Sequence, residues 1–219
     1  MSRKKRFSAI IFDLDGVIVD SMPYHFIAWY EALRPLGTRV SCFEVFAKEG
    51  ENWEKSLKEF LGKAGIAPKP ALLKKIFASR QKIFKKYFRR HFFPGAADFI
   101  FCLKKSGYRL GLVTGTPLAS ARTILPEKLF AAFDAVVSGD SVKQGKPHPE
   151  PYLKAARLLK LPPRECAVIE NAPLGIESAK KAGMFCFAVT TSLPAEYLRR
   201  ADCIVSDLRR IMPMIEKAC

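Results

Sequence analysis

The 219-residue sequence lacks the marks of several protein classes. No apolar run reaches the ~18–20 residues that a membrane-spanning helix needs. The N-terminal stretch MSRKKRFSAIIFDLDG is basic and then apolar, but its apolar part is too short for a secretory signal and ends in aspartates. There is no internal repeat and no low-complexity tract, and 49% of the residues are hydrophobic, which excludes global disorder. We therefore expect a soluble, cytoplasmic protein with a packed core.

Paired cysteine motifs are also missing. The six cysteines contain no CxxC pair, and several lie in apolar runs: Cys42, Cys102, Cys166, Cys186, Cys203 and Cys219. Metal centres and disulfide frameworks need tighter or more regular spacing. We interpret the cysteines as small buried hydrophobic residues in a reducing compartment.

Acidic residues are scarce. The chain has 21 Asp and Glu against 37 Lys and Arg, a net charge of +16, so it attracts anions such as phosphorylated metabolites, nucleic acids or anionic membrane surfaces. Residues 71–93 contain no acid, and their apolar residues recur at helical spacing with basic residues between them. This pattern predicts a helix with a solvated basic face. Alternatively the face steers anionic substrates, with Lys82 as the candidate to reach the site, or it binds nucleic acid or a membrane surface; nucleic acid is not the expected partner.

Six short β-branched stretches predict strands, at residues 9–15, 109–115, 135–140, 166–171, 185–190 and 203–207. They are apolar without alternation, which is typical of strands covered on both faces. Helical patterns at 96–107 and 175–183 each end in glycine. The alternation predicts an α/β fold with a parallel sheet and helices on both faces. Residues 17–93 have helical periods and no convincing strand, so we expect a core of residues 1–16 and 94–219 with an all-α insertion at 17–93.

Polar residues follow four of these strands. They are Asp13 and Asp15 after the first, Thr114, Gly115 and Thr116 after the second, Lys146 after the third, and Glu170 and Asn171 after the fourth. In open parallel sheets, ligands bind beyond the carboxyl ends of the strands. We therefore expect these side chains to form one site.

The residue types at this site suit phosphoryl transfer. A carboxylate is an available nucleophile at neutral pH, and its attack on a phosphate ester gives an acyl phosphate. Two anions ~4 Å apart repel by roughly 4 kcal/mol at an effective dielectric of ~20. Mg²⁺ and Lys146 would offset that repulsion. Thr114 offers a hydroxyl to the phosphoryl group, and Asp15 can act as general acid and then as general base.

Four segments carry a resemblance to a known family. FDLDGVIVDS, LVTGT, GKPHPEPY and VIENAPLGIESAKKAG resemble, in order and spacing, the four motifs of the haloacid dehalogenase (HAD) superfamily, in the branch of β-phosphoglucomutases and phosphoglycolate-type phosphatases. The resemblance implies a Rossmann-like three-layer core with a small helical cap inserted after the first strand. It assigns Asp13 as nucleophile and Asp15 as acid/base, while Thr114 and Lys146, with Gly115 and Thr116, hold the phosphoryl group. Asp13, the backbone carbonyl of Asp15, Glu170 and Asn171 would surround Mg²⁺.

The resemblance also indicates where this chain differs. Asn171 replaces the usual aspartate, which predicts weaker Mg²⁺ binding. The segment DSMPYHFIAWYEAL is similar to a cap helix that turns His25 and Trp29 toward the site. Trp53 stands where mutases of the branch carry an arginine for a second phosphate, and Leu118 stands near a mutase asparagine. We therefore expect a Mg²⁺-dependent phosphatase of a small phosphorylated metabolite, such as a sugar phosphate or phosphoglycolate, with a β-phosphoglucomutase-type mutase as the alternative.

Overall fold

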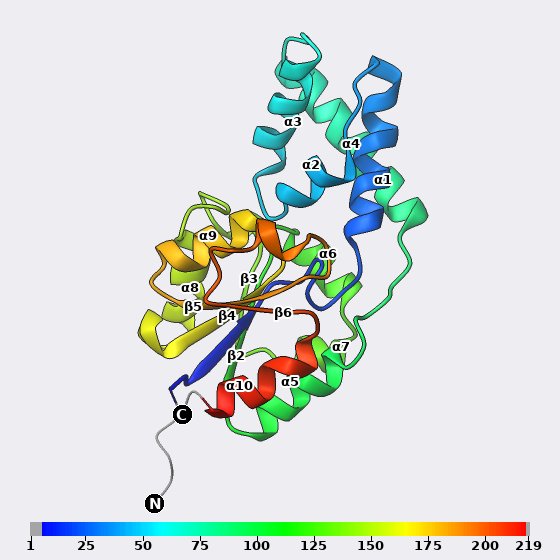
Figure 1. Cartoon of the computed structure of the whole chain (residues 1–219). Helices are drawn as coiled ribbons and strands as arrows, with labels where there is room; N and C mark the ends of the chain where they lie inside the picture. The colour runs from blue at the N-terminus through cyan, green and yellow to red at the C-terminus, as the bar shows by residue number, and fades with distance from the viewer. Residues whose placement is uncertain (1–5, 218–219) are drawn as a thin grey trace, which may run out of the picture.

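The computed structural model describes residues 6–217, so the basic segment 2–5 and Cys219 lie outside it. Six strands form one parallel sheet in the order β3-β2-β1-β4-β5-β6 (Figure 1). The strands are β1 (Ala9–Phe12), β2 (Arg109–Val113), β3 (Ala135–Val137), β4 (Cys166–Glu170), β5 (Phe185–Val189) and β6 (Cys203–Val205). All six strands were predicted, but each is shorter because the polar residues at its end are already loop. Within the described residues, no helix is long and apolar enough to cross a bilayer.

Helices cover both faces of the sheet, so the predicted three-layer α/β core is confirmed. Ile10 and Phe12 of β1 face one apolar cluster, whereas Ala9 and Ile11 face another. The first cluster includes α5 (Ala96–Lys105), α6 (Leu118–Ile124), α7 (Glu127–Phe130) and α10 (Ile211–Lys217). The second includes α8 (Glu150–Leu158) and α9 (Pro173–Lys181), on the other side of the sheet (Figure 1). Burial on both faces explains why these strands are apolar without alternation.

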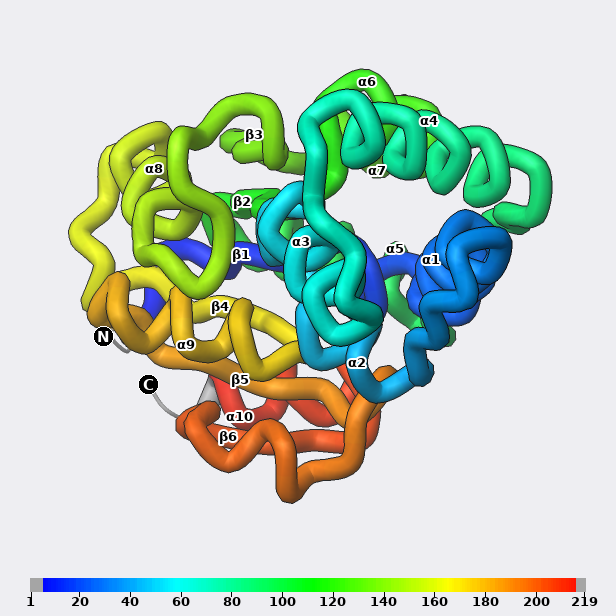
Figure 2. Tube along the Cα trace, turned by 90° about the horizontal axis from the view of Figure 1, so that it is seen from above, coloured from blue at the N-terminus to red at the C-terminus, as the bar shows by residue number. Residues whose placement is uncertain are grey.

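Four helices lie between β1 and α5 in the chain and stand together above the sheet (Figures 1 and 2). They are α1 (Met22–Leu33), α2 (Cys42–Ala47), α3 (Trp53–Lys63) and α4 (Pro70–Tyr87), called the cap below. The cap has its own apolar cluster, built on residues such as Trp29, Phe60 and Ile76. Val19 still belongs to the core cluster and forms a β-bridge with Phe92. The segment that leads from the core into the cap therefore lies beside the segment that leads back. The expected limits at 17 and 93 remain a prediction.

Short polar motifs fix where the cap helices begin. Ser41 accepts a hydrogen bond from the Glu44 backbone while Glu44 accepts one from the Ser41 backbone, a capping box that starts α2. The Asn52 side chain accepts the Glu54 N–H (2.9 Å) and starts α3. These capping hydrogen bonds fix where α2 and α3 begin, and so they constrain the loop that joins the two helices.

Cysteine burial was predicted correctly only in part. Cys166 and Cys186 are buried in the sheet, as expected. Cys42 and Cys102 are exposed, so the expectation of buried cysteines was wrong for these two. Both lie on helices, where only one face is covered.

Candidate active site

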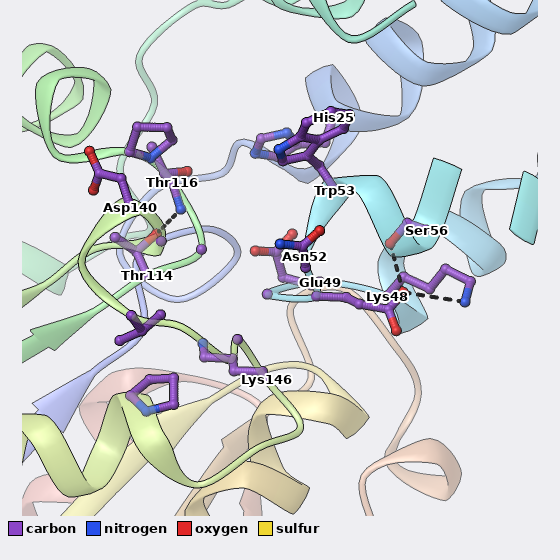
Figure 3. Close-up of a pocket in the computed structure, with 18 of the residues that line it drawn as sticks. His25, Lys48, Glu49, Asn52, Trp53, Ser56, Thr114, Thr116, Asp140 and Lys146 are labelled. Atoms are coloured by element: carbon purple, nitrogen blue, oxygen red, sulfur yellow. Dashed lines mark hydrogen bonds and ion pairs between the residues drawn. The ribbon is translucent and has the colours of Figure 1, made fainter. Parts of the chain in front are cut away.

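A cavity of about 250 Å³ lies between the carboxyl ends of the strands and the cap. Thr114, Gly115, Thr116 and Lys146 line it from the core. The cap contributes His25, Trp29, Glu49, Trp53 and Arg80. Figure 3 shows Thr114, Thr116 and Lys146 facing His25, Trp53 and Glu49 across this space. The sheet therefore brings the strand-end residues together, as its parallel topology requires.

Asp13 and Lys146 form a buried ion pair at the end of β1. Lys146 Nζ lies 2.6 Å from Asp13 Oδ1 and 2.6 Å from Glu170 Oε1. Burial raises the pKa of Asp13, Glu170 and Asp15 raise it further, and Lys146 opposes them. Burial lowers the pKa of Lys146, but Asp13 and Glu170 outweigh it and hold that pKa above its ordinary value. Lys146 thus remains a cation fixed beside the candidate nucleophile.

Glu170 is held by three donors. Besides Lys146, the Tyr152 hydroxyl donates to Oε1 (2.6 Å) and the backbone N–H of Asn171 donates to Oε2 (3.0 Å). Gly175 of α9 packs on this carboxylate, and a Cβ there would lie 1.9 Å from Oε1. Sequence reasoning missed Tyr152, although it is the last residue of the GKPHPEPY segment. Glu170 therefore fixes Lys146, and little of its carboxylate is left free.

Two buried acceptors at the strand ends have no partner among the described residues. They are Asp13 Oδ2 and Asn171 Oδ1. The Asn171 amide nitrogen donates to Ser192 Oγ (2.8 Å), which leaves Oδ1 as the free end of that side chain. Buried acceptors without a donor are costly unless a ligand or ion fills the position. No sequence pattern indicates that Ser192 orients Asn171.

These free oxygens fit a hard divalent cation. Mg²⁺ takes oxygen ligands and keeps several waters, so a carboxylate, an amide oxygen and a backbone carbonyl such as that of Asp15 are suitable donors. No group of three His, Cys, Asp or Glu side chains among the described residues forms a metal cluster. The donor set is therefore compatible with Mg²⁺ bound mainly through Asp13 and Asn171, beside Glu170.

Asp15 is held from both halves of the molecule. From the cap side, the Ser21 hydroxyl donates to Oδ1 (2.6 Å), and His25 Nε2 lies 3.1 Å from the same oxygen. From the core, the hydroxyls of Thr114 (3.3 Å) and Thr116 (2.9 Å) donate to Oδ2. Burial raises the pKa of Asp15, but His25 and the hydroxyl donors outweigh it and hold that pKa well below its usual range. Asp15 is therefore an ionised acceptor in this arrangement.

Arg80, rather than Lys82, is the basic residue of α4 that reaches the cavity. The Arg80 guanidinium contacts His25 Nδ1 and lies 5.3 Å from the centre of the Trp29 ring. Lys82 is exposed and does not line the cavity, so the assignment to Lys82 was wrong. Two residues along a helix turn a side chain by about 200°, which carries Lys82 to the opposite face.

The same contact fixes the protonation of His25. A guanidinium can only donate, so Nδ1 accepts from Arg80 and Nε2 carries the proton toward Asp15. Burial lowers the pKa of His25, Arg80 lowers it further, and Asp15 opposes them. His25 is therefore a neutral donor. Like Trp29, it faces the cavity as the sequence led us to expect.

The loop between α2 and α3 closes over the core half. Glu51 pairs with Lys146 in an isolated β-bridge. Gly50 lies against both Lys146 and Gly115, and a Cβ at Gly50 would meet Lys146 Cδ at 2.4 Å. This contact excludes solvent from the side of the cavity nearest the ion pair. Trp53 stacks on Phe77 with ring centroids 3.9 Å apart and forms part of the cap wall.

Comparison with known proteins identifies the family. Residues 7–183 match the haloacid dehalogenase-like hydrolases. The chain belongs to this family. It is 32% identical to the β-phosphoglucomutase of Bacillus subtilis over 193 residues (85% of this chain, 84% of that protein) and 32% identical to hexitol phosphatase A of Escherichia coli over 209 residues (94% of each). A solved β-phosphoglucomutase structure from Clostridium difficile shares the fold, with a TM-score of 0.85 at 24% identity over 97% of this chain and 96% of that one. The family and branch implied by the four motifs are thus confirmed.

Proposed function

We propose that this HAD-family hydrolase is a Mg²⁺-dependent phosphomonoesterase that forms an aspartyl phosphate on Asp13. One observation carries the proposal: a buried carboxylate at the end of β1 has one oxygen paired with Lys146 and the other without a partner, at a cavity of metabolite size. The free oxygen suits both attack on phosphorus and a shared cation. The sugar phosphatases and phosphomutases among its relatives support the same chemistry.

The reaction proceeds in two displacements. Asp15 first takes up a proton from water or from the monoprotonated phosphate ester. Asp13 then attacks the phosphorus while Asp15 gives that proton to the leaving oxygen, so the ester bond breaks as the acyl-phosphate bond forms. Asp15 then takes a proton from water, which attacks the phosphorus and releases inorganic phosphate and free Asp13. Lys146 and Thr114 hold the phosphoryl oxygens throughout. Asp13 and Asn171 would hold Mg²⁺, which would supply positive charge against the two anions.

Asp15 must lose some of its hydrogen-bond donors before it can carry a proton and act as the acid. It accepts four hydrogen bonds here, and each of them favours the ionised form. A leaving oxygen that displaces the Thr116 hydroxyl from Oδ2 would remove one of these donors. The leaving oxygen would then approach Asp15 from the cavity side, where Thr116 lies.

A phosphatase fits the cap better than a mutase does. A phosphosugar mutase must hold two phosphates at once, so it needs a free cation on the cap. Lys48 already pairs with Glu51 and Glu59, and Arg80 contacts His25. Trp53 occupies the cap wall where an arginine would serve a mutase. These residues favour release of phosphate over its return to the product.

The test is a screen of phosphorylated metabolites for Mg²⁺-dependent phosphate release, with glucose 1-phosphate to glucose 6-phosphate conversion measured alongside. We expect phosphate release by the wild type and loss of at least 10³-fold in kcat for Asp13→Asn, with the fold retained by circular dichroism. Fast isomerisation with little phosphate release would reverse the choice between phosphatase and mutase. Turnover retained by Asp13→Asn would exclude the covalent mechanism.

A further inference from the structure

One acid in the cavity has no part in the chemistry above. Glu49 follows α2, lines the cap side of the cavity and points into it (Figure 3). Among residues 6–217, no hydrogen bond or ion pair joins its carboxylate to another side chain. Burial raises the pKa of Glu49 well above its ordinary value, and Asp15 and Asp13 raise it further. A partly buried acid without a partner is positioned for a ligand.

The cations near Glu49 are already engaged. Lys48 forms ion pairs with Glu51 (3.5 Å) and with Glu59. Arg80 is held by its contact with His25 and by the rings of Trp29 and Phe84 beneath it. Only its Nε remains a buried donor without a partner. The cap half thus presents the Glu49 carboxylate without an ion-pair partner, while both cap cations that line the cavity are engaged.

The charges on the cap side of the cavity point in the same direction. The acids that line the whole cavity are Glu49, Glu51 and Asp140, and the cations are Lys48, Arg80, Lys143 and Lys146. Lys143 and Lys146 belong to the core, and both cap cations are engaged as described above. A second anionic group that reached the cap would therefore lie against Glu49. Like charges at close range are strongly disfavoured in a partly desolvated site.

We propose that Glu49 determines the substrate class: it accepts hydrogen bonds from the hydroxyls of an uncharged polyol leaving group and excludes leaving groups that carry a second phosphate or a carboxylate. Burial raises the pKa of Glu49, but hydroxyl donors favour its ionised form, and a carboxylate bound by them forms charge-assisted hydrogen bonds. The indole of Trp53, stacked on Phe77, gives a flat apolar wall for the carbon chain. The inference rests on the proposed phosphatase function.

The test compares two substrates that differ at one group. Glucitol 6-phosphate and 6-phosphogluconate differ only in having CH₂OH or a carboxylate at the end away from the phosphate. We expect kcat/KM of the wild type to favour glucitol 6-phosphate by at least tenfold. Glu49→Gln keeps the shape and removes the charge, so it should shrink this ratio about tenfold, partly by raising kcat/KM for 6-phosphogluconate. Glu54→Gln removes an exposed charge of α3 that does not line the cavity, and it should leave the ratio unchanged.

Each outcome decides between the two proposals. An unchanged ratio in Glu49→Gln, or a wild type that prefers 6-phosphogluconate, would overturn the role of Glu49 while phosphate release keeps the phosphatase. If Glu49→Gln failed to fold, Glu49→Ser would make the same comparison. Absence of Mg²⁺-dependent release from p-nitrophenyl phosphate, a probe with no polyol, would instead overturn the phosphatase function itself.

Discussion

Replacing Asn171 with aspartate should tighten Mg²⁺ binding at least tenfold. The change swaps one NH₂ for O⁻ at a buried side chain whose other oxygen has no partner. Ser192, which now accepts from the amide at 2.8 Å, can turn its hydroxyl and donate to the new carboxylate instead. The packing should therefore survive, and the variant isolates the effect of charge.

The magnitude follows from the Coulomb energy of the added charge. One unit charge and a divalent cation about 5 Å apart attract by about 1.7 kcal/mol even at the dielectric of water, ~80. An attraction of this size lowers the Kd for Mg²⁺ more than tenfold. A buried site has a lower effective dielectric, so this is a lower bound. Without metal, the new charge instead faces Asp13 and Glu170, and the variant should melt at a lower temperature than the wild type.

Isothermal titration of metal-free protein with MgCl₂ measures the change, and thermal melting with and without Mg²⁺ measures the repulsion. Asn52→Asp is the matched control, because it adds the same charge on the cap side of the same cavity. Aspartate caps a helix as well as asparagine does, so α3 should keep its start. Equal or weaker Mg²⁺ binding by Asn171→Asp would refute the assignment of Asn171 to the metal.

Three further perturbations test neighbouring parts of the site. Gly175→Ala places a methyl group 1.9 Å from Glu170 Oε1 and should weaken Mg²⁺ binding at least tenfold by titration calorimetry, with a lower melting temperature. Mg²⁺ should raise the melting temperature more at pH 8 than at pH 6, because the raised pKa of Asp13 means that the metal must displace a proton at the lower pH. Ser21→Ala removes a donor to Asp15, so the pKa of that carboxyl should rise and the alkaline limb of kcat/KM should move to higher pH.

Controls keep these outcomes separate from general destabilisation. Gly62→Ala, in α3 with open space around its Cβ, should stabilise the protein by about 0.5–1 kcal/mol and leave Mg²⁺ binding unchanged. Asp13→Asn should abolish the pH dependence of the Mg²⁺-induced rise in melting temperature. A rise that still depends on pH would mean that the proton displaced by Mg²⁺ is not on Asp13. Ser41→Ala, a cap serine that does not touch Asp15, should leave the pH profile in place. Unchanged Mg²⁺ affinity in Gly175→Ala would exclude Glu170 from the metal site.

The fold could be predicted because its signals are local. Strands covered on both faces must be apolar throughout, and the polar residues that interrupt them mark the edge where a ligand binds. Asp13, Thr114 and Lys146 follow such strands and Glu170 ends one, so the topology brings them together whatever the details of packing. The four motif segments add their order along the chain.

The cap side of the site could not be predicted in the same way. Arg80 and Lys82 lie in the same basic helix, but Arg80 is four residues from both Ile76 and Phe84 and so shares the apolar face of α4, a signal that the basic pattern concealed. Glu49 lies in a loop whose path depends on contact of Gly50 with the core. Ser192 meets Asn171 from the loop after β5. The positions of Glu49 and Ser192 depend on tertiary approach, for which sequence periodicity carries no signal.

Asp15 joins these two halves chemically. Its Oδ2 is held by the core hydroxyls of Thr114 and Thr116, whereas Ser21 and His25 hold Oδ1 at the start of α1. Any movement of α1 that separates His25 from Asp15 removes donors that favour the ionised form, and the pKa of Asp15 must then rise. The position of the cap therefore sets the proton affinity of the group that the proposed reaction needs first as an acid and then as a base. Enclosure of the substrate and readiness for proton transfer are consequences of the same contacts.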